Sequence, residues 1–298
     1  MIENFSAQCL ALVVTHNRLQ DLKVAIEALH NQTYNHLDIL VVNNGSVDGT
    51  KEWLQTQSDL IVINQDNLGG AGGFYAGMEY MINHEYQWLF MMDDDGIPDS
   101  NEISSLVNAY NEICKDKMAI LNALVIDKDN HNRTSFYWKP ELHIPENVNE
   151  IIKLKYINGN IHPFNGTFVH RDIINRIGLI KKEMFIWGDE QEYIARAVHN
   201  GIDLITVTSA IHYHPKEKGK VGNIFPFIKR FKVLLKPKHL SHYYYRNEGY
   251  INKKYPHKKT DNLVFVTAYT LRFLLHFEFK EWAKFIKYYI RGRNNDYR

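Results

Sequence analysis

Short apolar runs alternate with polar loops and amphipathic segments along the N-terminal part of the chain. We predict buried strands at the runs 9–14, 37–42, 60–63 and 87–92. Apolar residues recur on one face over 19–29 and predict a helix there, and a second helix is predicted over 74–84. Strands and helices that alternate at this spacing are typical of an α/β fold with a mostly parallel sheet.

Polar loops follow the predicted strands. They comprise residues 15–18, 43–46, 67–73 and 93–95. Ligands of open parallel sheets bind at the carboxyl ends of the strands, where such loops lie side by side. We therefore expect these loops to meet in one crevice.

The rest of the chain predicts a less regular arrangement. Helices are expected over 103–114 and 190–200, and strands over 118–126, 133–138, 164–170, 203–208 and 210–214. Beyond residue 223, basic and aromatic residues alternate and predict amphipathic helices over 225–235, 239–255, 263–277 and 281–290. We predict two parts, an α/β domain at 1–222 and a basic helical C-terminal region at 223–298.

The composition is that of an ordinary globular protein, with 45% hydrophobic and 23% charged residues. No apolar run reaches the roughly 18 residues that a membrane-spanning helix needs. The first apolar run is of strand length and follows polar residues, so no signal peptide is expected. Cys9 and Cys114 form no metal or redox motif, and we expect free thiols in a cytoplasmic protein.

The charge of the chain changes sign toward its C-terminal end. The net charge is +1, but residues 215–298 hold 20 Lys and Arg against 6 Asp and Glu, a net +14. Residues 1–214 hold the other 15 basic and 28 acidic residues, a net −13. The basic tail is a solvated surface, or it contacts an anionic membrane or a phosphate-bearing acceptor. An interface in a homo-oligomer is a further alternative that the sequence leaves open.

Three adjacent carboxylates, Asp93, Asp94 and Asp95, follow the fourth predicted strand. They repel one another unless a cation is present, and Mg²⁺ and Mn²⁺ bind carboxylate and phosphate oxygens together. In an extended segment the first and third side chains point the same way, so Asp93 and Asp95 can share a metal site. The alternative is a helix start with acidic residues in its first turn.

Two histidines, His212 and His214, end the last predicted strand and lie on the same face of it. An imidazole nitrogen can complete a divalent-metal site begun by two carboxylates. We favour His214 as this ligand because it is nearer the loop, and a structural role is the alternative.

A glycine cluster at 69–73 follows Asn67 and opens a predicted helix. Glycine lets a backbone approach a ligand closely, and the free N–H groups of a helix start favour phosphate. Asn67, Gly70, Gly72 and Gly73 are therefore candidates for ligand binding, with a flexible loop as the alternative. The cluster is neither a dinucleotide fingerprint, which follows the first strand, nor a P-loop, which needs Gly-Lys-Ser/Thr.

Trp187 precedes an acidic helix start that contains Asp189, Glu190 and Glu192. The helix dipole stabilises acids there, so a helix cap explains them without a function. The functional interpretation is a general base that removes the proton of an attacking hydroxyl group. Arg196 lies one helical turn beyond Glu192 and can pair with it.

The sequence Tyr-Arg-Asn at 245–247 lies in the basic region. The fork of a guanidinium suits phosphate, so Arg246 is a candidate for diphosphate contact. Tyr245 and Trp187 are candidates for stacking on the sugar of an acceptor. An aromatic patch in the core or facing a membrane is the alternative.

Several of these segments resemble family 2 glycosyltransferases. They are Val-Val-Thr-His-Asn-Arg at 13–18, Val-Val-Asn-Asn-Gly-Ser-Val-Asp-Gly-Thr at 41–50, the Asp triad, and Trp-Gly-Asp-Glu-Gln-Glu-Tyr at 187–193. The resemblance runs from about residue 10 to residue 215. It implies a Rossmann-like GT-A fold and the transfer of a sugar, with inversion, from a nucleotide-sugar donor. The segment 67–74 and the later Tyr-Arg-Asn are similar to the galactofuranosyltransferase and rhamnosyltransferase branch.

The resemblance also implies roles for individual residues. The nucleotide would be held by Thr15, His16, Asn17, Arg18, Asn43 and Asn44. Asp93 and Asp95 would occupy the Asp-x-Asp positions and bind Mn²⁺ or Mg²⁺ with His214, while Asp94 would contact the ribose or a neighbouring side chain. Glu190 would be the base, although most members have Asp at this position, and Asp189 is its rival. Many members also have aspartate where Asn43-Asn44 stands, so the nucleotide remains open.

The expected function is the transfer of galactofuranose from a UDP-sugar to a carbohydrate acceptor in bacterial-type surface polysaccharide synthesis. A rhamnosyltransferase that uses dTDP-rhamnose is the alternative. A nucleotidyltransferase would need glycines in the loop 15–18, and a non-catalytic sugar-binding module would not need the full set of acids. A lipid-linked acceptor at the inner face of the cell membrane would suit the basic tail, and no nucleic-acid partner is expected.

Overall fold

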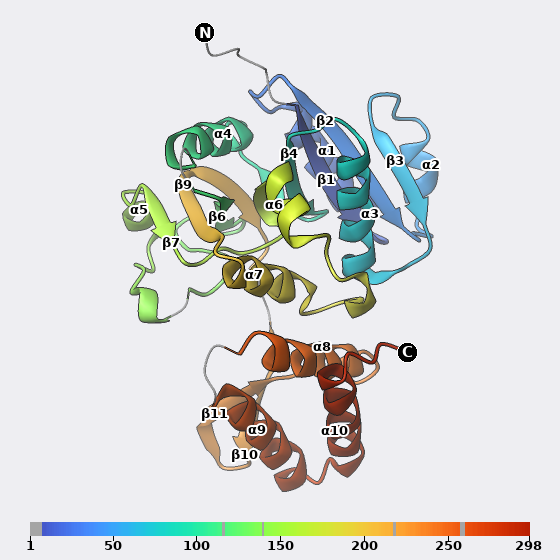
Figure 1. Cartoon of the computed structure of the whole chain (residues 1–298), viewed down its shortest axis with the longest axis vertical. Coiled ribbons are helices and arrows are strands. Elements are labelled where there is room, and N and C mark those ends of the chain that lie inside the picture. The colour runs from blue at the N-terminus through green and yellow to red at the C-terminus, as the bar shows by residue number, and fades with distance from the viewer. Residues whose placement is uncertain (1–7, 115–116, 139, 217–218, 257–259) are drawn as a thin grey trace. The chain divides into compact units, whose positions relative to one another are not determined.

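The computed structural model describes residues 8–114, 117–138, 140–216, 219–256 and 260–298 (Figure 1). The chain divides into two compact units. The α/β unit comprises Met1–Lys182 and Ala197–Glu217, and the C-terminal unit comprises Glu183–Arg196 and Lys218–Arg298. The acidic helix start at 189–192 therefore belongs with the C-terminal region, which no local sequence pattern indicates.

Among the described residues, nine strands form one sheet in the α/β unit. Its first half is parallel in the order β3–β2–β1–β4. These strands are β1 (Cys9–Thr15), β2 (Leu37–Asn44), β3 (Ile61–Gln65) and β4 (Trp88–Asp93). Every residue of β1 is buried, because the sheet is covered on both faces. The predicted parallel arrangement of these strands is confirmed.

The second half of the sheet is mixed. It contains β5 (Ile97–Pro98), β6 (Ala119–Asp127), β7 (Tyr156–Asn158), β8 (Asn165–His170) and β9 (Asp203–His214). β8 lies antiparallel between β4 and β6, and β6 pairs with β9 in parallel. β9 is one strand with an irregular register where two strands were expected. The strand expected over 133–138 is reduced to a bridge between Ile126 and Thr134.

Helices cover both faces of the sheet because the side chains of β1 alternate between them. Cys9, Ala11 and Val13 share a core cluster with α1 (Leu19–His30) and α4 (Glu102–Ile113). Leu12 and Val14 instead face α3 (Gly69–Asn83). The other helices described before residue 200 are α2 (Thr50–Leu54), α5 (Val148–Ile151), α6 (Arg171–Ile177), α7 (Asp189–His199) and the short turns Pro140–Leu142 and Lys182–Met184.

The C-terminal unit combines a hairpin with helices (Figure 1). Its elements are β10 (Val221–Phe225), β11 (Ile228–Leu234), α8 (Ser241–Lys254), α9 (Asp261–Leu275) and α10 (Phe279–Arg293). The last three helices are confirmed, but the helix predicted over 225–235 is wrong. Pro226 lies in the turn between β10 and β11, and only Val233 of β11 is buried, which suits a strand at an edge. α8 and α10 cross closely, since a Cβ atom on Gly249 or Gly292 would overlap backbone of the other helix.

Candidate functional site

The strand-end loops of the α/β unit meet, as the sequence predicts. His16 lies between them, with Nδ1 2.8 Å from the carbonyl oxygen of Asn44 and Nε2 3.3 Å from Nδ2 of Asn67. The Thr15 hydroxyl donates to the Asp94 carboxylate at 2.8 Å. Asn17 Oδ1 accepts the N–H of Val47 at 2.7 Å. These hydrogen bonds hold the loops after β1, β2, β3 and β4 together.

Asn43 and Asn44 fix the end of β2, and each is only 2% exposed. Asn43 donates to Oδ1 of Asn64 at 2.8 Å. Asn44 accepts the N–H of Leu68 at 3.0 Å and donates to the carbonyl of Gly69 at 2.9 Å. An aspartate could not donate to Gly69, which is a physical reason for asparagine at position 44. These side chains connect the loops to one another.

The three candidate glycines of α3 differ in their surroundings. Apart from its chain neighbours and the backbone of its own helix, no described atom lies within 4 Å of a Cβ built on Gly70. A Cβ on Gly73 would overlap Cγ1 of Val14, and one on Gly72 would overlap the side chain of Leu68. Gly73 therefore allows α3 to pack closely on β1. Gly72 leaves room for the side chain of Leu68 at the start of the same helix, and Gly70 leaves open space there.

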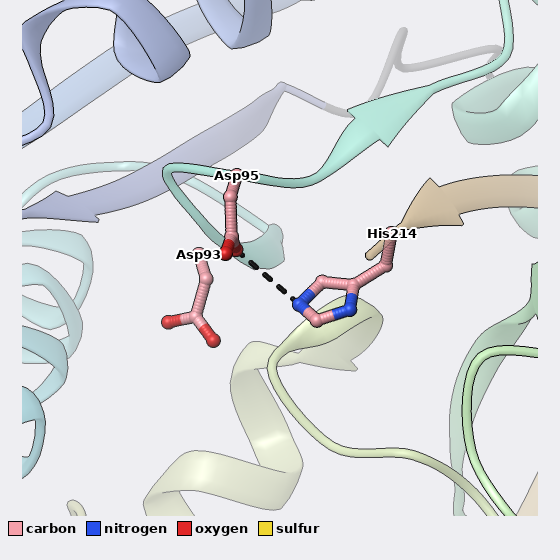
Figure 2. Close-up of side chains that lie close together, drawn as sticks. All are labelled: Asp93, Asp95 and His214. Atoms are coloured by element: carbon pink, nitrogen blue, oxygen red, sulfur yellow. Dashed lines mark ion pairs between the residues drawn. The ribbon is translucent and has the colours of Figure 1, made fainter. Parts of the chain in front are cut away.

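Asp93, Asp95 and His214 form a cluster at the ends of β4 and β9 (Figure 2). Each offers a ligand atom, and these atoms lie within 4.8 Å of one another. Nε2 of His214 lies 3.2 Å from Oδ1 of Asp95, and its Nδ1 lies 2.7 Å from the carbonyl oxygen of Pro215. In the neutral form with its proton on Nδ1, His214 donates to that carbonyl, and the lone pair of Nε2 is then available to a cation, whereas protonated Nε2 donates to Asp95. Two carboxylates and one imidazole are a donor set that fits Mn²⁺ or Mg²⁺.

The carboxylates of the cluster do not share one environment. Burial, and then the charges of Asp95 and Asp94, raises the pKa of Asp93 to about 7. Burial also raises the pKa of Asp94 to about 6. Burial acts in the same direction on Asp95, but the hydrogen bond and charge of His214 outweigh it and lower the pKa of Asp95 to about 2. Buried carboxylates that repel one another are stabilised by a cation.

Arg18 supplies a positive charge next to the triad. Its guanidinium lies 2.5 Å from Oδ2 of Asp95 and 3.3 Å from Oδ1 of Asp94. Asp94 is 4% exposed, and its carboxylate accepts hydrogen bonds from Thr15 and Arg18. Of the two contacts expected of Asp94, with the ribose or with a neighbouring side chain, the structure contains the second.

His212 has a different role from His214. It is fully buried, and its Nδ1 lies 3.1 Å from both carboxylate oxygens of Glu102 on α4. Burial lowers the pKa of His212 to about 3 and raises the pKa of Glu102. Of the two histidines, it is His214 that lies with the aspartates, and the Glu102–His212 pair joins α4 to β9.

The acidic helix start lies in the C-terminal unit. Asp189 is 4% exposed and Glu190 is half-buried. A carboxylate oxygen of Glu190 accepts the N–H of Gly188 at 3.1 Å. Glu192 forms the predicted ion pair with Arg196, at 2.6 Å. Acidic residues are stabilised at this end of α7 by the helix dipole.

The Tyr-Arg-Asn segment faces the protein interior, which corrects the contacts expected of it. Tyr245 is 2% exposed in an aromatic cluster, and its hydroxyl donates to Glu281 at 3.0 Å. Arg246 is 6% exposed and donates to the carbonyl of Glu183 at 2.7 Å. A stacking role for Tyr245 and a diphosphate contact for Arg246 are thus replaced by contacts within the protein. Trp187 lies 4.7 Å from the ammonium group of Lys236.

Residues 11–177 match glycosyl transferase family 2, and the chain belongs to this family. It is similar to galactofuranosyltransferase GlfT1 of Mycolicibacterium smegmatis, with 28% identity over 214 residues, 69% of this chain and 70% of that protein. For GlfT1 of Mycobacterium tuberculosis H37Rv the identity is 29% over 213 residues, 69% of each chain. An undecaprenyl-phosphate mannosyltransferase of Micrococcus luteus is 29% identical over 105 residues, 34% of this chain and 43% of that protein.

Solved structures of low sequence identity share the fold, which is GT-A. A mannosyltransferase of Pyrobaculum calidifontis in complex with GDP-Man and Mn²⁺ has a TM-score of 0.55 and 13% identity, over 96% of this chain and 74% of that one. GalNAc-T7 with UDP, GalNAc and Mn²⁺ has a TM-score of 0.60 and 14% identity, over 99% of this chain and 59% of that one. Within the described part of the chain, no helix combines the length and the apolar character needed to cross a membrane.

Proposed function

We propose that this protein transfers galactofuranose from UDP-galactofuranose to a hydroxyl group of a glycan acceptor, with inversion at the anomeric carbon. The observation that carries the proposal is the cluster of Asp93, Asp95 and His214 among the strand-end loops. It occurs in a chain that is similar to GlfT1 over 69% of its length.

The chain's residues divide the work of this reaction. Asp93, Asp95 and His214 would hold Mn²⁺ or Mg²⁺, which supplies positive charge to the departing diphosphate. The loops that contain Thr15, His16, Asn17, Arg18, Asn67 and Gly70 would bind the UDP part. Glu190 removes the acceptor proton while the acceptor oxygen bonds to the anomeric carbon, and the bond from that carbon to the diphosphate breaks with its electrons on the diphosphate oxygen. Glu190 is favoured over Asp189 because it is the less buried of the two.

A comparison of donors tests the proposal. We expect UDP release from UDP-galactofuranose with Mn²⁺ present, little release from UDP-galactopyranose, and loss of release on chelation with EDTA. The pyranose is a matched control, because it differs from the furanose only in ring size. Preference for dTDP-rhamnose would refute the proposed donor, and turnover that survives EDTA would refute the metal requirement.

The base assignment has its own test. Glu190→Gln keeps the size of the side chain and removes its negative charge, so transfer should fall by about 10²–10⁴-fold while UDP still binds. Asp189→Asn is the matched control and should remain active. If Asp189→Asn shows the larger loss, Asp189 is the base.

We further propose a lipid-linked acceptor at the cytoplasmic face of a membrane. The net charge of +14 over residues 215–298 supports attraction to anionic lipid. The name of the similar mannosyltransferase of Micrococcus luteus also refers to a lipid-linked phosphate. Transfer to acceptors with and without a lipid tail would test this, since equal rates on both would refute it.

A further inference from the structure

The loop that leads into α7 has an unusual backbone. Phe185, Trp187 and Gly188 have φ angles of 68°, 58° and 110°, in the region that most side chains avoid. Such conformations persist only where surrounding groups hold them. Glu190 lies two residues beyond this loop and accepts a hydrogen bond from its last residue, Gly188. The position of Glu190 within the C-terminal unit therefore depends on what holds the loop.

Asn247 of α8 makes the main contacts to the loop. Its side chain is fully buried, and its Nδ2 lies 2.9, 3.1 and 2.8 Å from the carbonyl oxygens of Met184, Ile186 and Trp187. An amide group has two N–H bonds, so one of them is shared between two carbonyls. A Cβ on Gly188 would lie only 3.0 Å from Cβ of Asn247. The loop thus rests directly on α8.

Arg246 holds the start of the same loop. Its guanidinium lies 2.7 Å from the carbonyl oxygen of Glu183 and 3.4 Å from that of Met184. The rings of Tyr297 and Tyr243 lie 4.3 and 5.2 Å from it. Aromatic faces attract a guanidinium and restrict its motion. Together, Arg246 and Asn247 engage four backbone carbonyls of the loop.

We propose that Arg246 and Asn247 are positioning residues that hold the loop 183–188 and thereby set the place of the Glu190 carboxylate. The proposal rests on the proposed function, in which Glu190 is the base. Arg246 and Asn247 would thus assist proton removal indirectly, because they hold the backbone of the loop that carries Glu190. The C-terminal helices are then a scaffold for the base.

Asn247→Asp is the variant that separates this role from simple packing. It keeps the size of the side chain but turns a donor into an acceptor that faces three carbonyl oxygens. We expect kcat for transfer, corrected for the folded fraction, to fall about 10²-fold. Donor KM should change by less than about threefold, because the loss affects the transition state more than donor binding. If Asn247→Asp does not fold, Arg246→Lys, which keeps the charge and loses the fork, takes its place.

A double-mutant cycle shows whether the effect passes through Glu190. In the Glu190→Gln protein, Asn247→Asp should cause no further loss of kcat beyond about twofold. A further loss of about 10²-fold would overturn the proposal, because Asn247 would then act by another route. Unchanged kcat in the single variant Asn247→Asp would also overturn it. Full activity of Glu190→Gln is a different outcome, which would refute the base assignment of the proposed function.

A second and independent observation concerns the β10–β11 hairpin. Phe227 in its turn is 97% exposed, and Ile228 and Phe231 on β11 are 49% and 48% exposed. Lys229 and Arg230 lie between these apolar residues and are also exposed. Within residues 221–234 the sequence contains Lys229, Arg230 and Lys232 and no Asp or Glu. The hairpin thus combines exposed aromatic rings with basic residues and no acidic residue of its own.

We infer that the hairpin tip docks on an anionic lipid surface. Aromatic rings lie at the level of lipid headgroups, and Lys and Arg are attracted to anionic lipids. The absence of acidic residues over 221–234 removes the repulsion that such a surface would otherwise cause. Figure 1 shows the hairpin beside α9, and the inner side chain Val233 packs into the aromatic cluster of this unit, so the exposed residues are presented by a folded element.

Sedimentation with lipid vesicles tests this surface. The full chain should bind vesicles of phosphatidylglycerol and phosphatidylcholine, and not vesicles of phosphatidylcholine alone. Phe227→Asp and Lys229→Glu should each lower the partition coefficient about tenfold. Val24→Asp, at a residue of α1 that is 47% exposed, is the matched control and should bind like the wild type. If Phe227→Asp binds these vesicles as the wild type does, the inference is overturned. It is also overturned if this substitution changes the self-association of the protein and leaves its vesicle binding unchanged.

Discussion

Gly70→Ala and Gly73→Ala add the same methyl group to the same helix, yet we predict opposite effects on stability. A Cβ at position 73 would overlap Cγ1 of Val14 and lie 3.2 Å from its Cγ2. Valine is stiff at χ1, and the neighbouring strands hold β1, so neither can move aside easily. Such overpacking costs about 1–3 kcal/mol. Position 70 has open space, and alanine there should gain up to about 1 kcal/mol in helix propensity.

Urea unfolding of the two variants and the wild type, followed by circular dichroism, measures this difference. Because alanine's helix propensity favours both variants, Gly73→Ala should unfold at a lower urea concentration than Gly70→Ala by an amount equivalent to about 1–3 kcal/mol. UDP binding should be weakened in Gly70→Ala, which lies at the helix start proposed for the diphosphate. Equal stability of the two variants would refute the assignment of Gly73 to close packing.

Two further predictions concern the titratable groups. His214→Ala should weaken Mn²⁺ binding with little loss of stability, whereas His212→Leu should cost about 3 kcal/mol in the urea assay because it leaves the carboxyl group of Glu102 buried without its partner. Burial, and then the charge of Glu190, raises the pKa of Glu248 from 4.5 to about 7. The stability that the protonated carboxyl group of Glu248 contributes is fully present below the unfolded pKa and is lost as the pH rises through 7. Glutamine keeps its neutral form, so the stability of Glu248→Gln relative to the wild type should rise by on the order of 2 kcal/mol from about pH 5 to about pH 8. A constant difference in unfolding midpoint across this range would contradict that prediction.

The sequence predicts the sheet best where local pattern and tertiary environment agree. The runs 9–14, 37–42 and 87–92 are apolar except at Asp38 and Gln87, because both faces of the sheet are covered. Their parallel order follows from the helices between them. The insertion of β8 between β4 and β6 is not in any local pattern, since it depends on which strands pair over long separations. The helix predicted over 225–235 is wrong, because the basic and apolar residues there lack a clear period and do not separate a helix from a strand.

In the candidate site, too, local sequence patterns predict some residues, while contacts over long sequence separations determine the others. Asp93, Asp95 and His214 could be found because the residue types and their places at strand ends suit a metal. The buried pair of Glu102 and His212 could not be found, because the two residues are 110 positions apart in the sequence. An acidic residue in an amphipathic helix also does not by itself indicate that it is buried or paired. The partners of Arg246 and Asn247 could not be predicted either, since backbone carbonyls of a distant loop leave no mark in the sequence.

The central claim is that Asp93, Asp95 and His214 hold the divalent ion that sugar transfer requires. Titration of Mn²⁺ into the protein in the presence of UDP, followed by electron paramagnetic resonance, tests it directly in the wild type and in Asp95→Asn. Asp95→Asn keeps the size of the side chain and removes the charge that lies 3.2 Å from His214. We predict saturable binding by the wild type and a loss of affinity of at least about tenfold in the variant. Equal affinity in both proteins would contradict the account.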